Sequence, residues 1–157
     1  MAEVLFYHLT RTPLEVTLPD LLTKSRARGW NVVVRAGSAE RLDWLDQRLW
    51  LGADTSFLAH GFAGGGADAD QPILLTTGTD VPNNADILFA VDRATVSASE
   101  ANDFARVCVV FDGNDEPALT QAREQWKMLT DAGLPAKYWS QEGGGWAEKA
   151  SKNVPSA

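Results

Sequence analysis

Short apolar runs alternate along the chain with longer amphipathic segments. Five of these runs are rich in aromatic or β-branched residues and predict strands: 3–9 (EVLFYHL), 31–35 (NVVVR), 72–77 (PILLTT), 86–91 (DILFAV) and 107–111 (VCVVF). A further edge strand is predicted from Lys137 to Ser140. Runs that are apolar throughout are typical of a mostly parallel or mixed sheet covered by helices on both faces.

Three segments have helical periodicity: 17–28, 38–50 and 116–132. Thr17 and Ser38 suit the N-caps of the first two helices, and Pro19 would then fall in the first turn, where proline is tolerated. Gly133 ends the third helix. The order of elements predicts an α/β fold: one mixed, mostly parallel sheet flanked by about three helices.

The chain has the length of one compact domain, which we assign to residues 1–140. From Gln141 onward the sequence QEGGGWAEKASKNVPSA is glycine-rich and polar. We therefore expect residues 141–157 to form a poorly ordered tail.

The net charge is −7 and the pI about 4.7. Direct binding to DNA is disfavoured, because non-specific affinity comes from Lys and Arg that neutralise phosphates. No segment approaches the roughly 20 apolar residues of a membrane span, and no signal peptide is evident, so we expect a cytoplasmic protein. The single cysteine, Cys108, lies in an apolar run and is predicted to be a buried strand residue.

The glycine-rich segment from Gly61 to Asp70 (GFAGGGADAD) invites a nucleotide-binding interpretation. It lacks the Lys and Ser/Thr of a phosphate-binding loop, and a strand rather than a helix follows it. A surface loop or a partner-contact loop fits it better. His60 is expected to be a structural histidine, since no nucleophile pair accompanies it. The acidic segment 112–116 is expected to be a strand-to-helix turn, with Asp115 capping the following helix.

One margin of the third predicted helix combines cations with an aromatic residue. Its members are Arg123, Trp126, Lys127 and Thr130, which share a face at spacings of three and four. Two cations four residues apart do not stabilise a helix, but beside an aromatic side chain they could receive an acidic peptide with an apolar end. An ordinary solvated helix face is the alternative.

Two other functions stay open from the residues alone. A nucleotide-binding enzyme with a Rossmann-like sheet is one, although no catalytic pair, cofactor site or metal site is evident. Direct contact with DNA is the other, through the cations Lys24, Arg26, Arg28 and Arg35.

Several segments together resemble the chi subunit family of the bacterial DNA polymerase III holoenzyme. The most specific part runs from residue 42 to 75, with LDQRLW, SFLAHG and the PILL strand in order. A second part comprises Val110-Phe111-Asp112, AREQWK at 122–127 and Ala132-Gly133. The resemblance extends from VLFY at residues 4–7 to about Trp139.

This resemblance implies a fold like that of mononucleotide-binding domains, without a nucleotide site or catalysis. It implies a replication accessory subunit that binds the acidic C-terminal tail of single-stranded DNA-binding protein, which ends in Pro-Phe. The tail would contact Arg123, Lys127 and Trp126, where better-known relatives have Tyr. A second surface would bind the psi subunit or another clamp-loader component through Trp50, Phe57, Leu58 and Phe62, and DNA would be contacted only indirectly. The alternative for Trp50 and Phe57 is closure of the core under the glycine-rich segment.

Overall fold

The computed structural model describes residues 3–10, 14–50, 61–62, 72–78, 83–142 and 145–153. Its strands are β1 Glu3–Leu9, β2 Val32–Arg35, β3 Gly61–Phe62, β4 Ile73–Thr76, β5 Ile87–Ala90, β6 Arg106–Asp112, β7 Ala136–Glu142 and β8 Gly145–Lys152. Within the described residues these eight strands form one sheet in the order β3-β4-β2-β5-β6-β1-β7-β8. Neighbouring strands are parallel except for β7 and β8, which are antiparallel. The predicted mostly parallel α/β sheet is confirmed.

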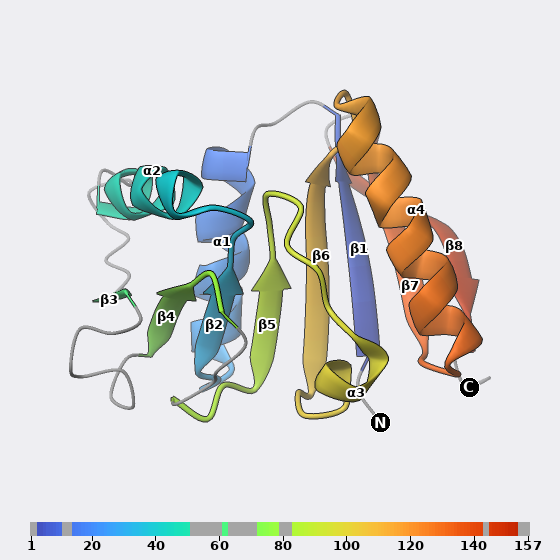
Figure 1. Cartoon of the computed structure of the whole chain (residues 1–157), viewed down its shortest axis with the longest axis horizontal. Helices are drawn as coiled ribbons and strands as arrows, with labels where there is room; N and C mark the ends of the chain where they lie inside the picture. Colours follow the sequence, from blue (N-terminus) through green and yellow to red (C-terminus); the bar gives the residue numbers. More distant parts are fainter. Residues whose placement is uncertain are drawn as a thin grey trace.

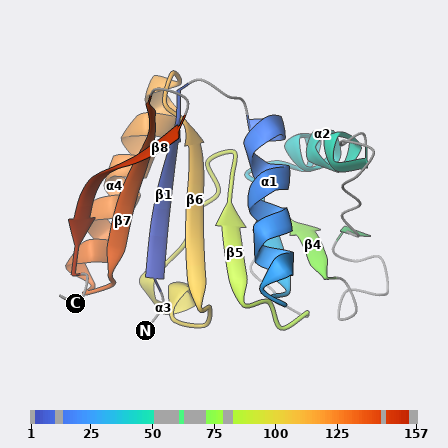
Figure 2. The same cartoon turned by 180° about the vertical axis from the view of Figure 1, so that it is seen from behind.

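The helices are α1 Leu14–Ala27, α2 Ala39–Trp50, α3 Ala98–Ala101 and α4 Glu116–Asp131. In Figure 1, α3 and α4 lie in front of the sheet, and Figure 2 shows α1 on the opposite face. The short α3 was not predicted. Its local signal is a capping box, in which Ser97 Oγ accepts from the Glu100 backbone and the Glu100 carboxylate accepts from the Ser97 backbone.

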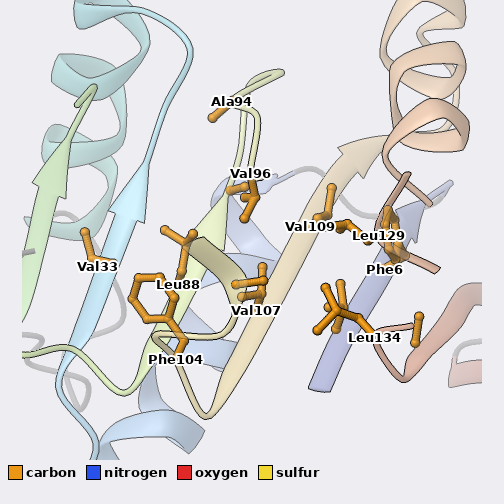
Figure 3. Packing of buried hydrophobic residues seen from close by; sticks show 14 of the residues in the cluster. Phe6, Val33, Leu88, Ala94, Val96, Phe104, Val107, Val109, Leu129 and Leu134 are labelled. Atoms are coloured by element: carbon orange, nitrogen blue, oxygen red, sulfur yellow. The ribbon is translucent and has the colours of Figure 1, made fainter. Parts of the chain in front are cut away.

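Two apolar cores lie on the two faces of the sheet, because successive strand residues point to opposite sides. On one face, Leu22 of α1 and Leu45 of α2 pack against the sheet. On the other face, α4 contributes Leu129, which lies beside Phe6 of β1, as Figure 3 shows. Burial on both faces explains why the strand sequences are apolar throughout.

The first helix begins earlier than the sequence predicted. α1 starts at Leu14, so Thr17 is not its N-cap, and Pro19 lies inside the helix beyond the first turn. Thr17 is only 8% exposed, because the turn that contains it packs with Leu18 against the core. The predicted cap of α2 is confirmed: Ser38 Oγ accepts from the Arg41 backbone at 3.2 Å.

The C-terminal segment also differs from the expectation of a poorly ordered tail. Residues 145–152 form β8, which pairs along the length of β7. The Trp146 ring packs edge-on against Tyr7 with centroids 5.2 Å apart, which adds apolar contact that the polar composition did not indicate. Whether residues 1–140 and 141–157 are separate units stays a prediction.

Candidate functional site

Helix α4 carries the candidate binding residues, and both of its ends are defined. Asp115 is at the N-cap position, as predicted, but its carboxylate binds Arg93 at 3.2 Å rather than the helix backbone. At the other end Gly133 has φ +90°, and the Leu134 and Gly133 amides donate to the carbonyls of Leu129 and Thr130. This Schellman arrangement ends the helix where the sequence predicted.

Three of the four predicted residues lie together along one margin of α4. Arg123 and Lys127 are exposed, and Trp126 between them is half-buried. The inner part of the Trp126 indole contacts Phe6 and Tyr138, both edge-on, with ring centroids 5.3 and 6.0 Å apart. The indole is therefore held in one orientation by the core while its outer part stays accessible.

The fourth residue, Thr130, does not share this surface. It is 4% exposed, and its hydroxyl donates to the Trp126 carbonyl at 2.7 Å, within the helix. Its own carbonyl accepts from the Asn153 side chain at 2.9 Å. Spacing placed Thr130 on the same margin, but the helix is rotated so that this position faces the core.

A half-buried polar pair near Arg123 was missed by sequence reasoning. The Tyr138 hydroxyl lies 2.7 Å from Nδ1 of His8, and the pair packs against Phe111. His8 and Tyr138 come from β1 and β7, which are more than 120 residues apart in the chain and pair in parallel. The alternating pattern of residues 3–9 places His8 on the side of Phe6, but no local signal identifies its partner.

The positive charge of Arg123 affects the pKa values of both His8 and Tyr138. Burial lowers the pKa of His8, and the nearby Arg123 guanidinium lowers it further. The pKa of Tyr138 is raised by burial, and the Arg123 guanidinium offsets part of this rise. Arg123 and Lys127 form no ion pair with any residue in the described part of the chain. These cations are thus available for an acidic ligand.

The second predicted surface lies largely outside the described residues. Trp50 is the last residue of α2 and Phe62 lies in β3, the outermost strand at one edge of the sheet. Phe57, Leu58 and His60, with the segment 63–71, fall outside the part that the structure describes. The clamp-loader contact therefore stays a prediction.

A cavity of about 390 Å³ opens at the carboxyl ends of β1, β5 and β6. Ligands of open α/β sheets commonly bind at such a position. Four of its charged groups form two ion pairs, Arg93 with Asp115 at 3.2 Å and Arg41 with Asp92 at 3.9 Å. A fifth, Asp112, accepts a hydrogen bond from the Asn114 backbone amide at 2.9 Å. The glycine-rich segment begins at β3, which is separated from β5 by β4 and β2, and its residues 63–70 lie outside the described part of the chain.

The cations proposed for direct DNA contact are used within the protein. Arg35 is 4% exposed and binds Glu100. Arg26 donates to the Trp30 carbonyl at 2.7 Å, Arg28 lies over the Trp30 ring, and Lys24 pairs with Asp20. Buried Arg35 therefore cannot join the other three in a basic surface, although Lys24 and Arg28 are exposed.

The described residues contain no cluster of three or more His, Cys, Asp and Glu side chains placed to hold a metal ion. None of their helices has the length and apolar character needed to cross a membrane. Cys108 is buried as predicted, and burial raises its thiol pKa to about 12.

Comparison with known proteins gives one family. Residues 1–137 match the family model of the DNA polymerase III chi subunit, HolC. A comparison with curated proteins gives no match. The match covers β1 to the first residues of β7, and it includes α4 with its exposed cations.

Proposed function

Because the chain belongs to the DNA polymerase III chi subunit family, we propose that it captures the acidic C-terminal tail of single-stranded DNA-binding protein and links it to the clamp loader. Family membership assigns the chain to a replication accessory role. The tail-binding step is a peptide-capture mechanism, without catalysis and with DNA contacted only through the partner.

One observation carries the proposal: Arg123 and Lys127 are exposed, have no ion-pair partner among the described residues and flank a half-exposed Trp126. A guanidinium can bind a carboxylate through two parallel hydrogen bonds, and an indole offers flat apolar area to a phenyl ring. The tail described by the resemblance carries both groups, in its acidic residues and in its terminal Phe.

The rigid packing of Trp126 also favours binding. Its ring is already held by Phe6 and Tyr138, so a ligand loses little freedom of the protein side chain when it docks. Binding through a few exposed charges is expected to weaken as salt rises. Several tails on an oligomeric partner would strengthen the attachment through effective concentration.

The clamp-loader side of the proposal involves Trp50, Phe57, Leu58 and Phe62, of which Phe62 belongs to β3. It is supported by the family match, which covers this segment, and by the position of β3 at the sheet edge opposite β8. A partner there and a tail on α4 could be held at the same time.

The test is a fluorescence anisotropy titration with a labelled acidic peptide that ends in Pro-Phe. Arg123→Ala should weaken binding by about 1–3 kcal/mol, or roughly 5- to 150-fold. Lys127→Ala should weaken it less, since an ammonium makes no bidentate contact. Lys24→Ala, an exposed cation on the other face, is the control and should leave the affinity unchanged.

A peptide without the terminal Phe should also bind more weakly than the intact peptide. Absence of binding to the intact peptide, or binding that salt does not weaken, would contradict the proposed mechanism. A rise in melting temperature with ATP or NAD would instead support a nucleotide-binding enzyme that uses the cavity at the carboxyl edge of the sheet.

A further inference from the structure

Strand β8 extends the α4 side of the sheet beyond the helix. Directly paired residues of an antiparallel ladder point to the same face. Ala150 is paired with Tyr138, and Lys152 is paired with Ala136. Because Tyr138 and Ala136 belong to the core beneath α4, Ala150 and Lys152 also lie on the α4 side. Both residues are exposed.

Contacts at both ends hold this strand in place. Near its start, Trp146 packs on Tyr7 on the other face of the sheet. Just past its end, Asn153 donates from Nδ2 to the carbonyls of Thr130 and Leu134, at 2.9 and 3.1 Å. Asn153 adopts φ +59°, a conformation that asparagine tolerates better than most residues. The last residues of β8 are therefore tied to the C-terminal end of α4.

The exposed charges nearest to Trp126 around α4 are the cations Arg123 and Lys127. Glu124 and Asp131 are also exposed on α4, but the 3.6-residue repeat places them further from Trp126 around the helix. Lys152 lies beside the last turn of α4, since the neighbouring Asn153 binds that turn, and Lys127 is exposed on the same helix. The acidic residue of the strand, Glu148, is paired with Trp139 and points to the opposite face. Ala150 is two residues before Lys152 on the same face and is paired with Tyr138, whose ring contacts Trp126. Its side chain is only a methyl group, which leaves room for a peptide to lie on the strand.

We infer that β8 is the second half of the tail-binding surface, with the acidic residues of the peptide lying over Ala150 toward Lys152 while its terminal Phe contacts Trp126. This inference rests on the proposed function and names a further part of the same site. Charge complementarity favours this occupant: Arg123, Lys127 and Lys152 lie on the side of Trp126 and β8, so an acidic peptide fits there better than a basic one. Since the family match ends at residue 137, this half lies outside the matched part of the chain.

Adjacent residues of β8 provide a matched pair of variants. Ala150→Glu places a carboxylate on the α4 side, and Ser151→Glu places the same charge one residue along, on the opposite face, since Ser151 is paired with Lys137. Both positions are exposed, so both variants should fold. Ala150→Glu should weaken binding of the acidic Pro-Phe peptide about 3- to 5-fold at low salt, and Ser151→Glu less than about 2-fold.

Lys152→Glu completes the test: the affinity for the full acidic peptide should fall about 3- to 10-fold. A peptide shortened to its last residues would not reach Lys152, so its affinity should not change in this variant. Similar effects of Ala150→Glu and Ser151→Glu would overturn the inference. If Arg123→Ala abolishes binding while Ala150→Glu has no effect, the inference fails and the proposed function stands. If the wild-type chain does not bind the peptide, the proposed function itself fails. A change of oligomeric state in Ala150→Glu with unchanged peptide affinity would assign the face to a second copy and overturn the inference.

Discussion

Replacing Arg35 tests how the centre of the sheet is joined to the loop after β5. Arg35 ends β2, and its guanidinium binds Glu100 at 2.9 Å, the Gly78 carbonyl at 2.9 Å and the Thr95 carbonyl at 3.0 Å. The side chain is 4% exposed. One buried cation thus connects three segments that are distant in sequence, and Arg35→Ala would leave their polar groups without this partner.

The cost follows from burial. Removing one partner of a buried ion pair costs about 3–5 kcal/mol, because the remaining charge stays uncompensated. The Glu100 side chain is 27% exposed, so water compensates part of the loss and the lower value, about 3 kcal/mol, applies here. In a domain of this size each kcal/mol lowers the melting temperature by about 2–4 °C. Arg35→Ala should therefore lower it by about 6–12 °C.

The assay is thermal or urea unfolding of Arg35→Ala beside Arg93→Ala. Arg93 also binds a carboxylate, that of Asp115 at 3.2 Å, but its side chain is 53% exposed. An exposed pair contributes about 0–1 kcal/mol, so Arg93→Ala should change the melting temperature by less than about 4 °C. Equal shifts for the two variants would refute the argument from burial.

The dependence of the Arg35 effect on pH is a second check. Burial raises the pKa of Glu100, but the Ser97 backbone amide and Arg35 lower it by more, and the net direction is downward. A carboxyl with a lowered folded pKa stabilises the protein above its unfolded pKa, and this contribution is lost as pH falls through the folded pKa. The difference between wild type and Arg35→Ala should therefore shrink in acid.

Three further outcomes are expected. Arg123→Gln should raise the pKa of His8, as measured by NMR titration. Because the pKa of His8 in the folded protein lies below the unfolded value near 6.5, the free energy of unfolding should fall as the pH is lowered through 6.5. This fall should be smaller in Arg123→Gln than in the wild type. Gly113→Ala should lower the free energy of unfolding in urea by about 1–3 kcal/mol, because the added Cβ would overlap the His8 ring. Gly78→Ala is the control and should be nearly neutral, because the nearest atom to its added Cβ would be 3.6 Å away. Cys108, with its pKa raised to about 12 by burial, should resist alkylation at pH 8 until the protein is unfolded; rapid labelling of the native chain would contradict this.

Much of the fold could be predicted because it depends on neighbours along the chain. Apolar strand runs and helical periodicity are local patterns, and they predicted the elements from β1 to β7 other than β3 and α3, with errors of a few residues at the ends. The helix stop at Gly133 and the cap at Ser38 are local as well. The capping box of α3 was equally readable, since Ser97 and Glu100 lie within one turn.

The sequence by itself also determined the central part of the candidate site. Arg123, Trp126 and Lys127 share a helix margin because of the 3.6-residue repeat, whatever the rest of the chain does. The same repeat could not tell which margin positions become buried. Thr130 is lost to the core because α4 packs against the sheet at one particular rotation, which is decided by contacts such as that between Trp126 and Phe6.

Only the tertiary structure decided which distant segments meet. β1 lies between β6 and β7, and this order joins His8 to Tyr138 under Arg123. β8 forms although most of its residues are polar or small, because β7 offers an unpaired edge and Asn153 can bind the end of α4. Which strands pair depends on the apolar area that the pairing buries and on the entropy lost in closing the loops between them. Both quantities depend on segments far apart in the sequence, so no local pattern of residues predicts the pairing.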